Sequence, residues 1–146
     1  MTQRHSSTNL LYPPFRDEIL KGIAKANQAG VPLAVFESYR SSERQDALYA
    51  QGRTTPGKIV TNAKGGDSWH QYGLAIDVAL FDDGEWSWNF DPKRVSQFFE
   101  SPLLKWGGTF KRPDGPHYEW SKKMSLSEAK AHSQAAGILY LWTKLT

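Results

Sequence analysis

A single acidic residue inside an apolar segment constrains this chain more than any other feature. Asp77 lies within Leu74–Phe81 (LAIDVALF), a run that predicts a buried strand. An unpaired carboxylate is costly to bury, so Asp77 needs a cation, a metal ion or several hydrogen-bond donors as partners. His70 is the nearest imidazole upstream, and Gly73 allows the backbone to bend between the two. The fold must therefore supply a polar partner at the middle of a strand.

The remaining pattern mixes helices and strands without regular alternation. Four segments have the apolar spacing, caps and breakers of helices: Pro13–Gly30, Ser42–Gly52, Asp91–Glu100 and Ser125–Leu145. Ser42 and Gln45 are interpreted as a capping box for the second of these. Two further short strands are expected, at Val31–Phe36 and His117–Trp120. We therefore expect an α+β fold, with a small, mostly antiparallel sheet flanked by helices.

Length and composition narrow the class of protein. The 146 residues suit one domain with one core, and disorder is expected only at the ends, where Met1–Asn9 are polar and lack periodicity. The 18 basic and 15 acidic residues give a net charge of +3 and are scattered, which is not a nucleic-acid signature. No stretch approaches the ~20 apolar residues of a membrane helix.

The absence of cysteine restricts the possible metal chemistry. Disulfides and thiolate ligands are excluded, so any metal ion must be held by His, Asp or Glu. The opening residues, MTQRHSSTNLLYPP, lack an apolar core of signal-peptide length. We therefore expect synthesis in the cytoplasm and, if the protein acts outside, release by another factor.

A second polar segment, DGPHYEW, adds Asp114, His117 and Glu119. A catalytic zinc usually takes three protein ligands and leaves its fourth position to water. His70, Asp77 and His117 fill that set, and Asp114 or Glu119 is then the candidate base. Simpler interpretations remain open from the spacing alone: a histidine packed beside a strand, Asp77 paired with an arginine, and Asp114 as a turn residue.

The string S-x-H-x-x-G-x-A-x-D, formed here by residues 68–77, resembles the signature of the zinc D-alanyl-D-alanine carboxypeptidase family. That family also includes bacteriophage L-alanyl-D-glutamate peptidases (endolysins), and the chain is most similar to the peptidase domain of Listeria-phage endolysins. The similarity runs from SYRSSERQDALYAQGRTTPGKIVTNAKGG through KWGG to PHYE, roughly residues 15–120. Residues 1–14 and 121–146 match nothing in it, and 121–146 are expected to form a helical extension of the single domain 1–146.

The resemblance implies a role for each residue of the site. The first His, the Asp and the last His of the family bind Zn²⁺, which implies His70, Asp77 and His117 as ligands. The acid three residues before the last His is the general base, here Asp114. The arginine of the family's S-x-R-type segment, here Arg40, polarises the scissile carbonyl.

The resemblance also suggests roles for two further residues, Ser68 and Glu119. Ser68 is expected near the substrate, where it would hold a carboxylate or the backbone, but a loop-capping hydroxyl fits it equally well. Glu119, in the segment HYE, is expected to support a ligand.

By this resemblance the chain is a zinc metallopeptidase, an endolysin that cuts the L-Ala–D-Glu bond of the peptidoglycan stem peptide. A D-Ala-D-Ala carboxypeptidase is the first alternative, because the metal signature does not separate the two. The likeness to endolysins and the missing signal peptide favour the endopeptidase. A non-catalytic wall-binding module is the second alternative, and the presence of Asp114 and Arg40 beside a full ligand set argues against it.

The partners follow from the same interpretation. We expect a monomer that binds the stem peptide and neither binds nucleic acid nor inserts into a membrane, with holin-type release to the cell wall. The final segment places Ile138, Leu141, Trp142 and Leu145 on one apolar face. This face is expected to pack on the domain rather than to target the wall.

Overall fold

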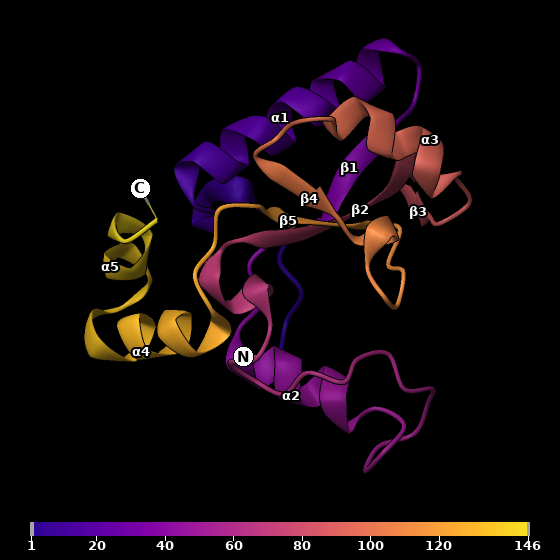
Figure 1. Ribbon diagram of the computed structural model, residues 1–146. Helices are drawn as coiled ribbons and strands as arrows, with labels where there is room; N and C mark the ends of the chain where they lie inside the picture. Colours follow the sequence, from indigo (N-terminus) through magenta and orange to yellow (C-terminus); the bar gives the residue numbers. More distant parts are fainter. Residues whose placement is uncertain (1, 146) are drawn as a thin grey trace.

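The core forms between a long N-terminal helix and one face of a sheet. The computed structural model describes residues 2–145 (Figure 1). Helix α1 (Pro13–Gln28) begins with two prolines, which suit a first helical turn because its N–H groups have no partner within the helix. Its buried residues include Phe15 and Ile19, both fully buried against the sheet.

Within residues 2–145 the sheet has five strands, in the order β1-β2-β5-β4 with β3 paired to β2, and every pairing is antiparallel. Their bounds are β1 (Leu33–Glu37), β2 (Ala75–Asp82), β3 (Glu85–Ser87), β4 (Leu104–Trp106) and β5 (His117–Trp120). The expected α+β fold, with a mostly antiparallel sheet flanked by helices, is confirmed.

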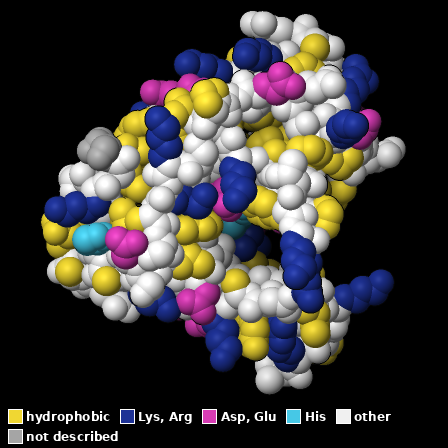
Figure 2. All heavy atoms as spheres, viewed as in Figure 1, with side chains coloured by type: hydrophobic (Ala, Val, Ile, Leu, Met, Phe, Trp, Pro, Cys, Tyr) yellow, Lys and Arg dark blue, Asp and Glu magenta, His cyan; other side chains and the backbone are white. Residues whose placement is uncertain are grey.

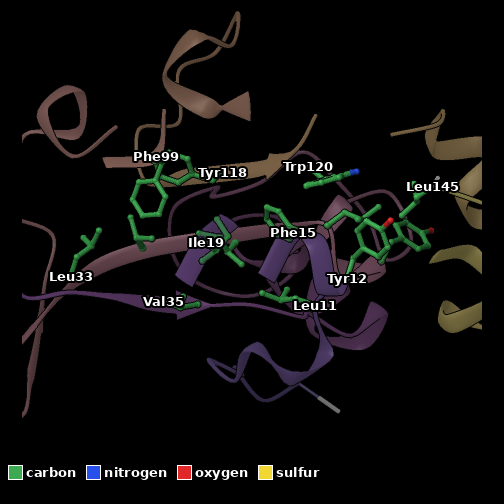
Figure 3. Close-up of a cluster of buried hydrophobic side chains, with 14 of the residues drawn as sticks. Leu11, Tyr12, Phe15, Ile19, Leu33, Val35, Phe99, Tyr118, Trp120 and Leu145 are labelled. Carbon is green, nitrogen blue, oxygen red and sulfur yellow. The ribbon is translucent and has the colours of Figure 1, made fainter. Parts of the chain in front are cut away.

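The two faces of the sheet differ in chemistry because side chains alternate along each strand. Leu74, Ile76 and Val78 are fully buried on the face that α1 covers. Figure 3 shows the core on this face, and the residues labelled there are Leu11, Tyr12, Phe15, Ile19, Leu33, Val35, Phe99, Tyr118, Trp120 and Leu145. Asp77 lies between Ile76 and Val78 and therefore points to the opposite face.

That opposite face is approached by helix α2 and the loop that follows it. Helix α2 (Ser42–Ala50) leads into residues 51–67, which contain no helix or strand beyond one isolated bridge between Gln51 and Thr55. Residues 51–67 thus form one long loop. Figure 1 places α1 and α2 on opposite sides of the sheet.

Short helical segments complete the fold. Helix α3 (Pro92–Ser96) starts after Asp91, whose side chain accepts from the backbone N–H of Lys93, as its sequence predicts. The 3₁₀ helices are η1 (Thr8–Leu10), η2 (Trp69–Tyr72), η3 (Gln97–Phe99) and η4 (Gly107–Thr109).

Three expectations were wrong in detail. The residue that caps α2 is Ser41, whose hydroxyl accepts from the N–H of Arg44, and Gln45 is buried instead of capping. Strands β3 and β4 were not predicted, since three residues carry too little alternation to be recognised. The single last helix is broken in two at Gly137, which adopts a φ of 88° that favours glycine.

The two C-terminal helices, α4 (Leu126–Ala136) and α5 (Ile138–Thr143), pack on the domain as expected. Ser125 and Glu128 form the predicted capping box of α4. Leu141 and Leu145 are buried, and the indole N–H of Trp142 donates to the carbonyl of Tyr72 at 2.8 Å. The extension therefore supports η2.

The N-terminal residues also differ from expectation. The carbonyl of His5 accepts from the backbone N–H of Ser38 at 2.8 Å, and the guanidinium of Arg4 donates to the carbonyl of Phe36. Residues 2–9 thus lie against β1 rather than free of the domain, while Met1 lies outside the described residues. Among the helices of residues 2–145, none has the length and hydropathy needed to span a bilayer.

Candidate active site

Strand pairing and one 3₁₀ turn bring the three predicted ligands together. In the antiparallel register of β2 and β5, Asp77 lies directly opposite His117. Helix η2 delivers His70 from the end of the long loop, and Gly73, with a φ of 68°, makes the predicted bend into β2. One ligand atom from each of the three side chains lies within 4.8 Å of the other two.

On each of the two imidazoles, one nitrogen lies beside an acceptor outside the ligand set and the other nitrogen faces Asp77. Nδ1 of His70 lies 2.8 Å from the carbonyl oxygen of Ser38, which can only accept, so this nitrogen carries the hydrogen. Nε2 of His70 then faces Oδ2 of Asp77 at 3.4 Å.

His117 has the reverse arrangement. Its Nε2 lies 2.9 Å from the carboxylate of Glu119, and its Nδ1 faces Oδ1 of Asp77 at 3.1 Å. Metal-bound histidines almost always donate their second N–H to a carboxylate or a carbonyl. Both imidazoles meet that condition, so this donor set fits a metal such as zinc.

Glu119 lies beside His117, where a residue that supports this candidate ligand is expected, and Lys123 contacts Glu119. The Lys123 ammonium is 3.0 Å from Oε1 of Glu119 and donates to the carbonyl of Trp120 at 2.7 Å. Burial opposes ionisation of Glu119, but hydrogen bonds and charge from His117 and Lys123 outweigh it and lower its pKa. Lys123 was missed because one lysine after a strand gives no sequence signal.

Without a metal ion, the charged side chains of the site stabilise one another's ionised forms. Burial alone would raise the pKa of Asp77, but His70 and His117 outweigh it and hold that pKa well below its usual range. Burial alone would lower the pKa of His117, yet hydrogen bonds to Asp77 and Glu119 raise it to about 10. The metal-free site thus keeps a proton on His117 where a metal would sit.

Arg40 lies beside this group and is itself nearly buried, with 9% of its surface exposed. Its Nη2 lies 2.8 Å from Glu37 and 3.4 Å from Oδ2 of Asp77, and its Nη1 donates to Gln45 at 3.0 Å. The position agrees with a role at the scissile carbonyl, which stays a prediction.

Two buried residues that the sequence analysis did not assign to the site, Glu37 and Gln45, hold Arg40 in place. The pairing of β1 with β2 shifts register between Val35 and Glu37, so Val35 faces the core while Glu37 is paired with Asp77 on the site face. Gln45 is fully buried and its amide donates to the carbonyl of Ala63 at 2.8 Å, which ties the long loop to Arg40. An acid directly after an apolar strand was the one available signal for Glu37.

Asp114 lies at the rim of the site. Its side chain is 56% exposed, and its Oδ2 is 4.0 Å from Nδ1 of His117. Partial burial, followed by the charge of Asp77, raises the pKa of its carboxyl. The adjacent Gly107 is required for close packing, because a Cβ there would lie 2.3 Å from the Asp114 carbonyl oxygen.

Ser68 caps the turn that carries His70. Its hydroxyl accepts from the backbone N–H of His70 at 3.3 Å, and its own N–H donates to Gln71 at 3.0 Å. Ser68 also lines the groove described next, so the capping role is present and a substrate contact stays a prediction.

The three candidate ligands lie in a groove of about 480 Å³ between the site face of the sheet and α2. Figure 2 shows this face hollowed, with Lys and Arg side chains along the sides of the hollow. The groove is lined at its margins by Phe36, Trp88, Leu48 and Gln51. A second hollow, formed by residues 59–62 and 112–114, shares Val60, Thr61 and Asp114 with it.

Comparisons with known proteins identify the family of the chain. The model of the D-alanyl-D-alanine carboxypeptidase family VanY matches residues 10–106. The chain is 42% identical over 108 residues to the peptidoglycan L-alanyl-D-glutamate endopeptidase CwlK of Bacillus subtilis. The aligned residues make up 66% of this chain and 65% of CwlK. The chain thus spans just under two thirds of that relative.

Solved structures share the fold. The L-Ala D-Glu endopeptidase ChiX of Serratia marcescens superposes with a TM-score of 0.59 at 22% identity, over 82% of this chain and 91% of ChiX. The vancomycin resistance D,D-dipeptidase VanXYg does so with a TM-score of 0.55 at 18% identity, over 92% of this chain and 58% of VanXYg. Because the family model matches residues 10–106, which is more than half of the chain, the chain belongs to the VanY family of D-alanyl-D-alanine carboxypeptidases.

Proposed function

We propose that this protein is a zinc-dependent peptidoglycan peptidase that cuts the L-Ala–D-Glu bond of the stem peptide. One observation carries the proposal: His70 Nε2, His117 Nδ1 and the Asp77 carboxylate converge at the floor of an open groove, while the other imidazole nitrogens are held by acceptors. When bound there, zinc would activate a water molecule and polarise a peptide carbonyl.

Each surrounding residue then has a task set by its position. Asp114 stands at the rim with a raised pKa, where its carboxylate takes a proton from water and passes one to the leaving amine. The Arg40 guanidinium, held by Glu37 and Gln45, offers positive charge to the oxygen of the scissile carbonyl.

The choice of bond is supported by similarity and by the shape of the groove. CwlK is named for the L-alanyl-D-glutamate bond. An endopeptidase needs a groove that continues on both sides of the cut, and here the groove runs on past Asp114 into the second hollow. The D-Ala-D-Ala carboxypeptidase activity of the matched family is the alternative.

Digestion of purified peptidoglycan, followed by mass spectrometry of the new termini, distinguishes these activities. The proposal expects new D-Glu amino termini, with L-Ala left on the glycan. Release of free D-Ala alone, from stems that otherwise stay intact, would assign the protein to the carboxypeptidase activity. No release of either kind, from a zinc-loaded protein, would favour the wall-binding alternative.

We further propose a lytic role of the endolysin type, in which a separate factor releases the protein to the wall. Its support is the similarity of residues 15–120 to endolysin peptidase domains. Purified protein should then lower the turbidity of cells whose outer layers have been permeabilised. Unchanged turbidity, with activity on purified peptidoglycan retained, would leave the peptidase and remove the lytic role.

A further inference from the structure

A row of four aromatic side chains, two of them exposed and two partly buried, borders the groove of the candidate active site and takes no part in the chemistry described above. We name Phe36, Phe81, Trp86 and Trp88 the aromatic strip. The ring centroids of Phe36 and Trp88 are 4.7 Å apart, those of Phe36 and Trp86 5.1 Å, and those of Trp86 and Phe81 4.7 Å. The strip therefore runs without interruption from the groove to Trp86 on β3 and Phe81 on β2.

The strip is partly exposed and fixed in place. Trp88 is 51% exposed and Phe81 44% exposed, although burial of large aromatic side chains is favourable. The guanidinium of Arg4 lies 4.0 Å from the centroid of Phe36 and 5.4 Å from that of Trp86, and these cation–π contacts help to fix the two rings. Clustered exposed apolar surface beside a groove is typical of a binding surface.

Continuity with the candidate active site indicates what binds there. Phe36 and Trp88 line the same groove as His70, Asp77 and His117. The second hollow, on the Asp114 side, includes neither aromatic residue and instead contains Arg112. The two hollows thus differ: the groove is lined by two aromatic rings, whereas the second hollow has none and carries the Arg112 guanidinium beside Ile59, Val60 and Asp114.

The proposed substrate has the same asymmetry. On one side of the scissile bond, L-Ala is joined through a lactyl group to a sugar of the glycan strand, so a pyranose ring lies roughly two residue lengths from that bond. On the other side, D-Glu and the rest of the stem carry carboxylates. The apolar face of a pyranose ring stacks on exposed aromatic rings, and carboxylates pair with a guanidinium.

We propose that the aromatic strip is a sugar-binding subsite, with Trp88 against the ring of the glycan that carries the stem peptide. The inference rests on the proposed function and adds the direction of the substrate: glycan over Phe36 and Trp88, acidic stem toward Arg112. The glycan then contributes to recognition, and the enzyme prefers stems that are still attached to the wall.

A comparison of two substrates tests the subsite. One is a stem peptide that carries its sugar on L-Ala, and the other is the same peptide with an acetyl group there, so that both have an amide at this position. Wild-type protein should have the higher kcat/KM on the sugar-linked peptide. Trp88→Ala should lower the ratio of the two kcat/KM values roughly tenfold, mainly through KM.

Two matched variants control for the substitution itself. Trp88→Phe keeps a ring and should retain most of the preference. Tyr140→Ala removes an exposed aromatic residue on α5, outside the groove, and should leave the ratio unchanged. A ratio unaltered in Trp88→Ala, or lowered equally in Tyr140→Ala, would overturn the subsite.

A binding measurement keeps the inference testable if the variant misfolds or if the proposed function fails. Glycan oligosaccharides freed of peptide should change the tryptophan fluorescence of the wild-type protein, and the change should saturate as the oligosaccharide concentration rises. Absence of such binding would contradict the subsite whether or not the peptide is cut. A wild-type protein that binds glycan but cleaves neither peptide would instead contradict the proposed function alone.

Discussion

The two faces of strand β2 follow different rules. On the face toward α1, Ile76 and Val78 are fully buried among apolar neighbours. On the other face, Asp77 is surrounded by Arg40, His70 and His117, all within 3.4 Å of its carboxylate. The apolar face therefore provides the stability of the fold, and the polar face holds charged groups whose arrangement fits a metal ion.

This contrast explains how a strand tolerates an acid at its centre. A buried ion pair is a weak source of stability, because desolvation offsets most of the attraction. The pairing of β2 with β5 above the apolar layer places Asp77 opposite His117. Changes on the polar face should thus alter metal binding and activity, and changes on the apolar face should alter stability.

The largest effect is expected from His70→Ala. This variant removes Nε2 from the ligand set and should lose both zinc and activity. Because His70 is buried and offsets the burial of the Asp77 carboxylate, the unfolding temperature of the metal-free protein should fall as well. Metal analysis and thermal unfolding in EDTA measure the two effects. Zinc retained at wild-type stoichiometry would show that His70 is not a ligand.

A smaller loss is expected from Asp114→Asn. The side chain is at the rim, 4.0 Å from His117, so zinc should remain bound while turnover falls by a factor of roughly 10²–10⁴. Single-turnover kinetics with a metal assay on the same sample measures both quantities. Loss of zinc without a change in the turnover of the remaining loaded protein would reverse the assigned roles.

The apolar face is tested with Ile19→Ala in α1. Ile19 is fully buried, and its truncation should lower the free energy of unfolding by about 2–5 kcal/mol. Zinc stoichiometry should not change at temperatures where the protein is folded. Ile19→Val, with an expected cost of about 0.5–1.5 kcal/mol, serves where the larger truncation unfolds the protein. Zinc loss from the folded valine variant would show that the two faces are not separable.

The effect that is smallest per step is a dependence of zinc affinity on pH. In the metal-free protein the pKa of His117 is raised to about 10, so its proton stabilises the fold below an unfolded value near 6.5, and that contribution is lost as pH rises through about 10. A bound metal requires the neutral imidazole. Zinc affinity should therefore rise by up to about tenfold per pH unit from pH 7 toward 10, as the metal-free fold weakens.

Titration calorimetry in two buffers of different ionisation enthalpy should detect about one proton released per metal ion at pH 7.5. The unfolding temperature of the metal-free protein gives the opposing trend. An affinity that does not change with pH would show that His117 is already neutral before the metal binds.

The sequence was sufficient for the parts of the fold that depend on local pattern. Helix α1, strand β2 and the loop 51–67 have strong periodicity or strong breakers, and the isolated acid at Asp77 already required a partner. Their prediction rests on residues close together in the chain.

The parts that were missed depend on contacts between distant residues. Glu37 reaches the site face only because β1 shifts register against β2, which no pattern within β1 reveals. Gln45 fits the sequence rule for a capping residue, yet its side chain is buried. Its amide oxygen accepts from Arg40 and Gln71, and its amide N–H donates to the loop. Strand β4 exists because Trp106 pairs with Tyr118.

The central claim is that His70, Asp77 and His117 hold a zinc ion that the reaction needs. Elemental analysis of the purified protein, paired with peptidoglycan digestion before and after EDTA, tests it most directly. The account predicts about one zinc per chain, activity abolished by chelation, and activity restored by added zinc. A protein that contains no stoichiometric metal and digests peptidoglycan fully in EDTA would contradict it.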